Sequence, residues 1–178
     1  MRVISGTARG SKLETLDGLS TRPTIDRVKE GIFSSVQFLI PGAKVLDLFA
    51  GSGQMGIESL SRGALSCTFV DSNPRAADIV KKNLKTCNLF DKSRVVNMPA
   101  QEFLSFSKDS FDLIFLDPPY NMGILDEILE KVSAITASGG IIMAESELEW
   151  QPKDDVPGLS QVKRFKYGKV AVTKFIKE

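Results

Sequence analysis

Histidine is absent from this chain of 178 residues, and cysteine occurs only twice. Without histidine, the usual zinc sites and catalytic groups of the Ser-His-Asp or Cys-His kind are excluded, and we expect no metal site. Two cysteines, Cys67 and Cys87, are too few for a disulfide framework. They fall in an expected strand and an expected helix, which is typical of thiols in a reducing cytoplasm.

Long hydrophobic runs are absent as well. The apolar stretches are far shorter than the roughly 20 residues of a membrane span, and residues 1–20 contain no apolar segment of the secretory kind. We therefore expect a cytoplasmic protein with no membrane partner. A chain of 178 residues with 42% hydrophobic and 25% charged residues fits one domain with a sizeable core.

Net charge is nearly absent, at +1, but it is unevenly distributed. Residues 1–44 hold seven Lys and Arg against four Asp and Glu, and residues 151–178 hold seven against three. Residues 45–150 hold nine against fifteen, a net charge of −6. An acidic centre with basic ends suits a catalytic core whose flanks contact phosphates, although charged ends also serve solubility.

Short apolar runs alternate with helical patterns from residue 44 onward. This alternation predicts a mostly parallel sheet with helices on both faces. After a polar stretch at 151–158, two strands joined at Tyr167-Gly168 predict a closing antiparallel hairpin. The expected strands are Lys44–Phe49, Ser66–Asp71, Ser93–Met98, Phe111–Leu116, Gly139–Glu145, Leu159–Lys166 and Lys169–Ile176, and the expected helices are Gln54–Arg62, Pro74–Leu89, Gln101–Phe106 and Gly123–Thr136.

The amino-terminal part is expected to form a small extension. Arg2–Ser5 and Lys12–Thr15 can pair as a hairpin around the glycines at positions 6 and 10. An apolar stripe then predicts a helix over Ile25–Phe38 that packs on the core. We therefore divide the chain into an extension at residues 1–40 and a main α/β domain at residues 41–178.

A glycine-rich loop follows the first expected strand of the main domain. Gly51-Ser52-Gly53-Gln54-Met55-Gly56 has the spacing G-x-G-x-x-G, and Asp71 lies 20 residues after Gly51. Such glycines let the backbone turn tightly beside a ligand, and an acidic residue at the next strand end accepts hydrogen bonds from ribose hydroxyls. S-adenosylmethionine and NAD both carry such a ribose, so the loop by itself leaves both cofactors open.

Two features favour the methyl donor over the dinucleotide. Asp47 lies before the glycines, where its carboxylate can face the ammonium and sulfonium end of S-adenosylmethionine but would repel a pyrophosphate. The second feature is the run Asp117-Pro118-Pro119-Tyr120, which has no role in hydride transfer. We therefore predict S-adenosylmethionine as the cofactor.

The run from Asp117 to Tyr120 has the groups needed to hold a flat nitrogenous base by its exocyclic amine. Asp117 and the carbonyl of Pro118 can accept the two N–H bonds, and Tyr120 can stack on the ring. This arrangement turns the nitrogen lone pair toward a donor methyl group. Carbon methylation would need a cysteine at the site, and neither cysteine lies near a strand's carboxyl end. Asp117, Pro118 and Tyr120 are therefore the expected catalytic residues.

Together these motifs resemble the RsmD family, bacterial 16S ribosomal RNA guanine-N2 methyltransferases, over nearly the whole chain. The resemblance implies a Rossmann-like class I methyltransferase fold with a mostly parallel seven-stranded sheet, an antiparallel C-terminal hairpin, and a small N-terminal hairpin and helix. The Asp-Pro-Pro-Tyr run is shared with adenine-N6 methyltransferases, so the Arg-Pro-Thr segment is the more specific match. The matching residues are Arg2–Gly6, Arg9-Gly10, Arg22-Pro23-Thr24, Asp26, Val28, Lys29, Glu30, Val45–Gly53, Gly56, Ser61–Ala64, Asp117–Tyr120 and Tyr167-Gly168.

The resemblance also implies which residues bind the donor. It places Arg22 and Thr24 beside the methionine end. Pro99 departs from the family pattern, because an acidic residue that contacts the adenine amine usually stands there. We expect Gln101 or the backbone to make that contact. The expected donor site is Arg22, Thr24, Asp47, Phe49, Gly51, Gly53, Asp71, Ser72 and Gln101.

The partner implied by the resemblance is 16S rRNA in a partly assembled small ribosomal subunit, bound by a monomeric enzyme. We expect residues 1–40 to dock RNA and cover the donor site, with Arg9, Lys12 and Lys166 as RNA contacts. One alternative is an adenine-N6 methyltransferase of DNA or RNA, which normally needs a recognition segment for which this chain has little room. Another is a non-catalytic RNA-binding protein on a methyltransferase scaffold, against which the intact motifs argue.

Overall fold

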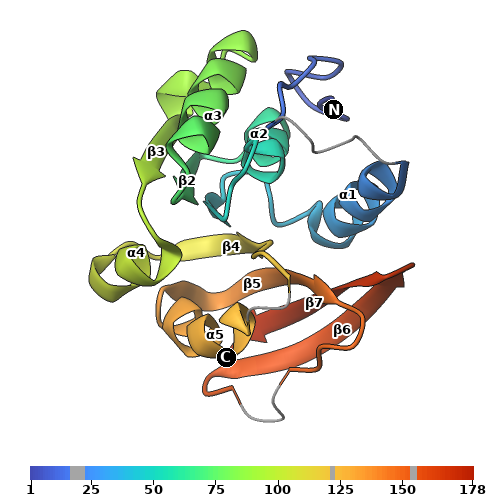
Figure 1. The fold of residues 1–178 in the computed structure, drawn as a ribbon, viewed down its shortest axis with the longest axis vertical. Helices are drawn as coiled ribbons and strands as arrows, with labels where there is room; N and C mark the ends of the chain where they lie inside the picture. Colours follow the sequence, from blue (N-terminus) through green and yellow to red (C-terminus); the bar gives the residue numbers. More distant parts are fainter. Residues whose placement is uncertain (17–22, 121–122, 153–155) are drawn as a thin grey trace.

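The computed structural model of the chain describes residues 1–16, 23–120, 123–152 and 156–178, with residues 23–26 described by their backbone only. Its centre is a seven-stranded sheet (Figure 1). The strands are β1 (Lys44–Leu48), β2 (Ser66–Asp71), β3 (Ser93–Asn97), β4 (Phe111–Leu116), β5 (Thr136–Glu147), β6 (Leu159–Tyr167) and β7 (Val170–Lys177).

The strand order is β3-β2-β1-β4-β5-β7-β6. The first five strands run parallel, and β7 lies antiparallel between β5 and β6. This order confirms the predicted fold class, a Rossmann-like sheet closed by an antiparallel hairpin. The helices are α1 (Pro23–Val36), α2 (Gln54–Ser61), α3 (Pro74–Thr86), α4 (Ala100–Phe106) and α5 (Ile124–Ala134), with a 3-10 turn η1 (Phe90–Lys92).

The core consists of two hydrophobic clusters, one on each face of the sheet. Side chains of α1, α2 and α3 form the first cluster, and side chains of α4 and α5 form the second. Successive strand residues point to opposite faces, so Val45 belongs to the first cluster and Leu46 to the second. Both cysteines are buried and free. In the part of the chain that the structure describes, no helix is long and apolar enough to span a bilayer.

The starts of α3 and β5 in the structure can be compared with the starts expected from the sequence. Pro74 occupies the first turn of α3, where the expected helix begins, and Asn73 caps that helix by accepting a 3.0 Å hydrogen bond from Arg75 N. The predicted start of β5 at Gly139 was wrong, because Thr136 already pairs with Phe111 before the register shifts. Gly139 has a φ of 74°, a turn conformation that resembles a loop in sequence but here lies within a strand.

The amino-terminal segment packs into the first cluster. Val3, Ala8 and Leu13 are buried there. The expected hairpin is reduced to a single antiparallel bridge between Arg2 and Lys12. Backbone hydrogen bonds between Val3 and both Gly10 and Ser11, together with the buried apolar side chains, hold this segment in place.

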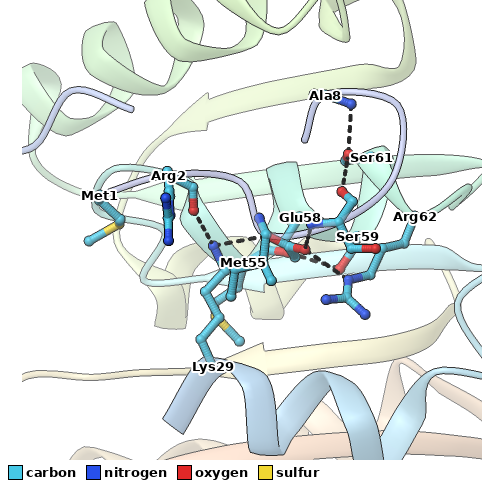
Figure 2. Close-up of polar contacts among 12 residues, drawn as sticks. Met1, Arg2, Ala8, Lys29, Met55, Glu58, Ser59, Ser61 and Arg62 are labelled. Atoms are coloured by element: carbon cyan, nitrogen blue, oxygen red, sulfur yellow. Dashed lines mark hydrogen bonds and ion pairs between the residues drawn. The ribbon is translucent and has the colours of Figure 1, made fainter. Parts of the chain in front are cut away.

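A buried ionic cluster fastens the same segment to the helices (Figure 2). Glu58 of α2 is fully buried and accepts hydrogen bonds from the backbone amides of Ile4 and Ser5, at 2.8 and 3.0 Å. It also pairs with Lys29 of α1 at 3.0 Å and with Arg62 at 2.8 Å. One carboxylate thus joins the amino-terminal segment, α1 and α2.

Candidate active site

The sheet brings four chain segments to one edge. Leu48 of β1 is the register partner of both Val70 and Leu116. Leu116 of β4 is in turn the partner of Ala144. Because parallel strands end at the same edge, the residues after these partners emerge there together. They are Phe49, Asp71, Asp117 and Glu145.

The glycine loop lies between β1 and α2 at this edge. Gly51 and Gly53 have φ angles of 54° and 76°, which favour glycine. At Gly56, a β-carbon would lie 2.3 Å from the ring of Phe69 and 2.6 Å from the sulfur of Cys67. The third glycine of the motif therefore lets α2 pack closely on β2, as in the expected nucleotide-binding loop.

Asp71 holds this loop at the end of β2. One of its carboxylate oxygens accepts a 2.8 Å hydrogen bond from Gly51 N, and the other accepts one of 2.8 Å from Asn73 N. A carboxylate has about four lone-pair sites. Acceptor capacity for ribose hydroxyls therefore remains, and the loop fits a nucleoside-carrying cofactor.

Phe49 shows the local strain of this turn. It adopts a φ of 73°, which is unusual for an aromatic residue. The amides of Phe49 and Ala50 both donate to the carbonyl of Val70 at 3.0 Å, so the chain turns sharply off the sheet. The half-buried Phe49 ring packs against the second hydrophobic cluster.

Asp47 lies beneath the loop and is 3% exposed. Its carboxylate accepts a 2.9 Å hydrogen bond from Gly56 N, so it positions the start of α2. Burial raises the pKa of Asp47 to about 7, the Gly56 bond lowers it and Asp71 raises it further. Asp47 pairs with Phe69 of β2 on one side and Phe115 of β4 on the other, so it lies between the two halves of the site, and it raises the pKa of Asp117.

The Asp-Pro-Pro-Tyr run leaves the sheet after β4. Pro118 is buried, and Asp117 is exposed as a residue although its carboxyl group is desolvated. Desolvation, followed by repulsion from Glu145 and Asp47, raises the pKa of Asp117 well above its ordinary value. The hydroxyl of Tyr120 donates a 2.6 Å hydrogen bond to Glu145 Oε1, and the tyrosine remains 41% exposed.

Glu145 is the residue of this site that the sequence analysis missed. It is half-buried at the end of β5, and desolvation raises the pKa of its carboxyl group while the Tyr120 bond lowers it. A signal for it existed. Glu145 follows the apolar run Ile141–Ala144 just as Asp117 follows Phe111–Leu116.

Of the remaining residues predicted to bind the donor, two lie near the same edge of the sheet and two lie outside the described residues. Ser72 is exposed after β2, and Gln101 is half-buried in the first turn of α4. Pro99 precedes that helix and leaves its carbonyl to accept from Phe103 N. Arg22 and the side chain of Thr24 lie outside the described residues.

The expected RNA contacts come from two different parts of the fold. Arg9, Lys12 and Lys166 are all exposed. Arg9 and Lys12 belong to the amino-terminal segment near α2, whereas Lys166 lies on β6, the opposite edge strand from β3 (Figure 1). Within residues 1–16, 23–120, 123–152 and 156–178, no three His, Cys, Asp or Glu side chains are grouped to hold a metal.

Fold and site together define an S-adenosylmethionine-dependent methyltransferase, because this strand order carries a glycine loop after β1 and an Asp-Pro-Pro-Tyr run after β4. The chain belongs to the family described as Conserved hypothetical protein 95, whose sequence model matches residues 1–176. The match supports the resemblance to the RsmD family.

Relatives and solved structures agree with this assignment. A Bacillus subtilis (strain 168) protein named "Putative rRNA methyltransferase YlbH" is 40% identical over 97% of this chain and 96% of its own. The Escherichia coli (strain K12) "Ribosomal RNA small subunit methyltransferase D" is 37% identical over 84% of this chain and 76% of its own. A solved structure, "Putative methyltransferase yhhF from Escherichia coli", superposes with a TM-score of 0.88 at 33% identity, covering 100% of this chain and 98% of the other.

Proposed function

We propose that this protein transfers a methyl group from S-adenosylmethionine to the exocyclic N2 amine of a guanine in 16S ribosomal RNA. The observation that carries the chemistry is the Asp117–Tyr120 run beside the glycine loop at one sheet edge. The ribosomal substrate is supported by the relatives named for rRNA methylation. Guanine N2 as the target rests on the resemblance to the RsmD family.

The donor would lie across the ends of β1 and β2. Its ribose hydroxyls would donate to Asp71, and Gly51 and Gly53 would let the backbone approach it closely. Asp47 would face its positively charged end. When bound, the cofactor supplies an electrophilic methyl group on a positively charged sulfur. The other proposed donor contacts are Phe49, Ser72 and Gln101, with Arg22 and Thr24 at the methionine end.

The base would enter from the β4 side. Asp117 and the Pro118 carbonyl would accept the two N–H bonds of the amine and aim its lone pair at the methyl carbon. The new C–N bond would form as the C–S bond breaks, with the electron pair of that bond returning to sulfur. The amine's surplus proton would pass to Asp117, which would already accept one of the amine's N–H bonds.

Tyr120 would stack on the extruded base. Base–aromatic stacking contributes about 1–3 kcal/mol, comparable to the few kcal/mol that unstacking a base from its helix costs. The hydrogen bond to Glu145 restricts the tyrosine ring before the base arrives. Less rotational freedom is then lost on binding.

The RNA would be docked by basic residues at both ends of the chain. Residues 1–44 and 151–178 carry net charges of +3 and +4, against −6 for the centre. Arg9, Lys12 and Lys166 are exposed representatives of these ends. Because little of the chain lies outside the core, we propose that a monomer recognises the shape of a partly assembled small subunit.

One experiment tests the function. The protein is incubated with labelled S-adenosylmethionine and either small-subunit particles, naked ribosomal RNA or DNA, and the modified nucleoside is identified by mass spectrometry. We expect N2-methylguanine, formed faster on particles than on naked RNA. Finding N6-methyladenine would instead support the adenine alternative.

Asp117→Ala is the matched catalytic control. Because Asp117 lies at a strand end and outside the core, the variant should fold while its single-turnover rate falls by about 100-fold or more. A rate within about threefold of wild type, roughly 0.7 kcal/mol, would show that Asp117 does not accept the amine.

A further inference from the structure

Glu145 lies beside Asp117 because of the sheet register. Leu116 and Ala144 are partners in the parallel pairing of β4 and β5, and Asp117 and Glu145 are the next residues on each strand. Phe115 and Met143, two residues earlier on each strand, both face the first hydrophobic cluster. The two carboxyl groups therefore lie side by side in the proposed base pocket.

Two carboxyl groups in this position are costly unless donors reach them. Desolvation raises the pKa of both groups, and Glu145 is the second cause of the shift at Asp117. Tyr120 supplies one donor to Glu145 Oε1, which uses only part of that carboxylate's acceptor capacity. An N–H donor on a ligand would relieve the pair further.

We propose that Glu145 selects guanine over adenine by accepting the N1–H of the base while Asp117 accepts the neighbouring amine. The inference rests on the proposed function and names the base-reading residue of that site. On guanine, the N1–H lies next to the exocyclic amine on the Watson–Crick edge, so two adjacent donors meet two adjacent acceptors.

Adenine presents the wrong pattern to the same pair. Its N1 carries a lone pair and no hydrogen beside the N6 amine, so Glu145 would face another acceptor. Acceptor facing acceptor in a desolvated pocket is strongly unfavourable, and sites built to bond an N–H reject analogues that lack it. The Asp-Pro-Pro-Tyr run can hold either amine, and Glu145 decides which base enters.

Tyr120 links recognition of the Watson–Crick edge by Glu145 to stacking of the base on its own ring. Its hydroxyl fixes the orientation of the Glu145 carboxylate, and the same bond orients the ring that would stack on the base. Tyr120→Phe should therefore lower the overall rate and weaken, without abolishing, the preference for guanine, because Glu145 stays but loses the donor that orients it. Glu145→Gln should change the preference itself, because an amide can donate to an unprotonated N1.

The test uses 2-aminopurine, which keeps the N2 amine but carries a lone pair at N1. Small-subunit particles are reconstituted with RNA that has guanine or 2-aminopurine at the methylated position, and kcat/KM is measured for each. Wild type should prefer guanine by about 100-fold or more. Glu145→Gln should narrow the preference to within about tenfold, and the exposed Glu149→Gln should keep the wild-type preference. Thermal melting and donor affinity confirm that each variant is folded.

The outcomes separate this inference from the proposed function. If wild type forms N2-methylguanine but methylates 2-aminopurine equally fast, the role of Glu145 is refuted while the function stands, and no variant is needed to reach that conclusion. An undiminished guanine preference in Glu145→Gln refutes it as well. If wild type forms N6-methyladenine, both fall, because adenine then enters despite Glu145.

Discussion

The amide of Gly51 donates a 2.8 Å hydrogen bond to the carboxylate of Asp71, which lies 20 residues further along the chain. This bond joins the loop after β1 to the end of β2. The residue proposed to bind the donor ribose is therefore also the residue that shapes the glycine loop. Its two roles can be separated by substitution.

Asp71→Ala should weaken S-adenosylmethionine binding by about 1.5–3 kcal/mol, because a charge-assisted hydrogen bond to ribose is lost. Asp71→Asn, which keeps an acceptor oxygen for Gly51, should lose less. Isothermal calorimetry measures both, with the exposed Asp78→Ala as control. Unchanged affinity in Asp71→Ala would remove Asp71 from the donor site.

Asp47 should make stability depend on pH. Burial raises its pKa from 3.8 to about 7, so the folded protein keeps a proton that the unfolded chain releases between these values. This contribution to stability is present below about pH 4 and lost as the pH rises through 7.

Asp47→Asn stays neutral and keeps an acceptor for Gly56. Relative to wild type, its free energy of unfolding should rise between pH 4 and 8, reaching a gain on the order of 4 kcal/mol, because each pKa unit corresponds to about 1.4 kcal/mol. Urea unfolding across this range measures the difference, with the exposed Asp91→Asn as control. A difference that does not change with pH would contradict the shift.

Glu58→Gln should be strongly destabilising. It leaves the ammonium of Lys29, a residue 1% exposed, without its buried anion, and breaking such a pair by removing one partner costs about 3–5 kcal/mol. Glu14→Gln is the matched control, because its pair with Lys82 is exposed and should contribute at most about 1 kcal/mol. Equal losses in urea unfolding would contradict the importance of burial.

The stabilisation from the ionic cluster around Glu58 should be lost at acidic pH. Burial by itself would raise the pKa of Glu58, but Lys29 and the Ile4 amide outweigh it and lower the pKa below 4.5. The stabilisation is therefore present above pH 4.5 and lost as the pH falls through the lowered pKa. In Glu58→Gln, the free energy of unfolding should therefore fall less steeply with decreasing pH than in wild type, because no carboxylate at position 58 becomes protonated.

Replacing Arg9, Lys12 and Lys166 by alanine should weaken RNA binding and reduce its salt dependence. The slope of log K against log salt should fall by roughly 0.7–0.9 for each lost phosphate contact. Donor affinity should be unchanged. The control replaces three exposed lysines of the acidic centre, and an equal effect of both sets on the slope would refute the proposed surface. Those control residues are Lys92, Lys108 and Lys131.

The sequence by itself determined the local features of this protein. Runs ending at Phe49, Asp71 and Leu116 predicted where strands end, and the glycine spacing predicted the loop between β1 and α2. These features follow from periodicity and backbone conformation within a few residues, which a sequence displays directly. Gly139 misled the strand assignment, because a turn-forming residue within a strand has the same local signature as a loop.

The tertiary structure decided which distant residues meet. Register between β4 and β5 set Glu145 beside Asp117, 28 residues apart in the sequence. Packing of the amino-terminal segment buried Glu58 among groups from three elements. Both contacts are long-range, and no local pattern specifies the partner of a buried carboxylate. Strand pairing and the docking of the helices and the amino-terminal segment onto the sheet, driven by burial of apolar surface, fix those partners.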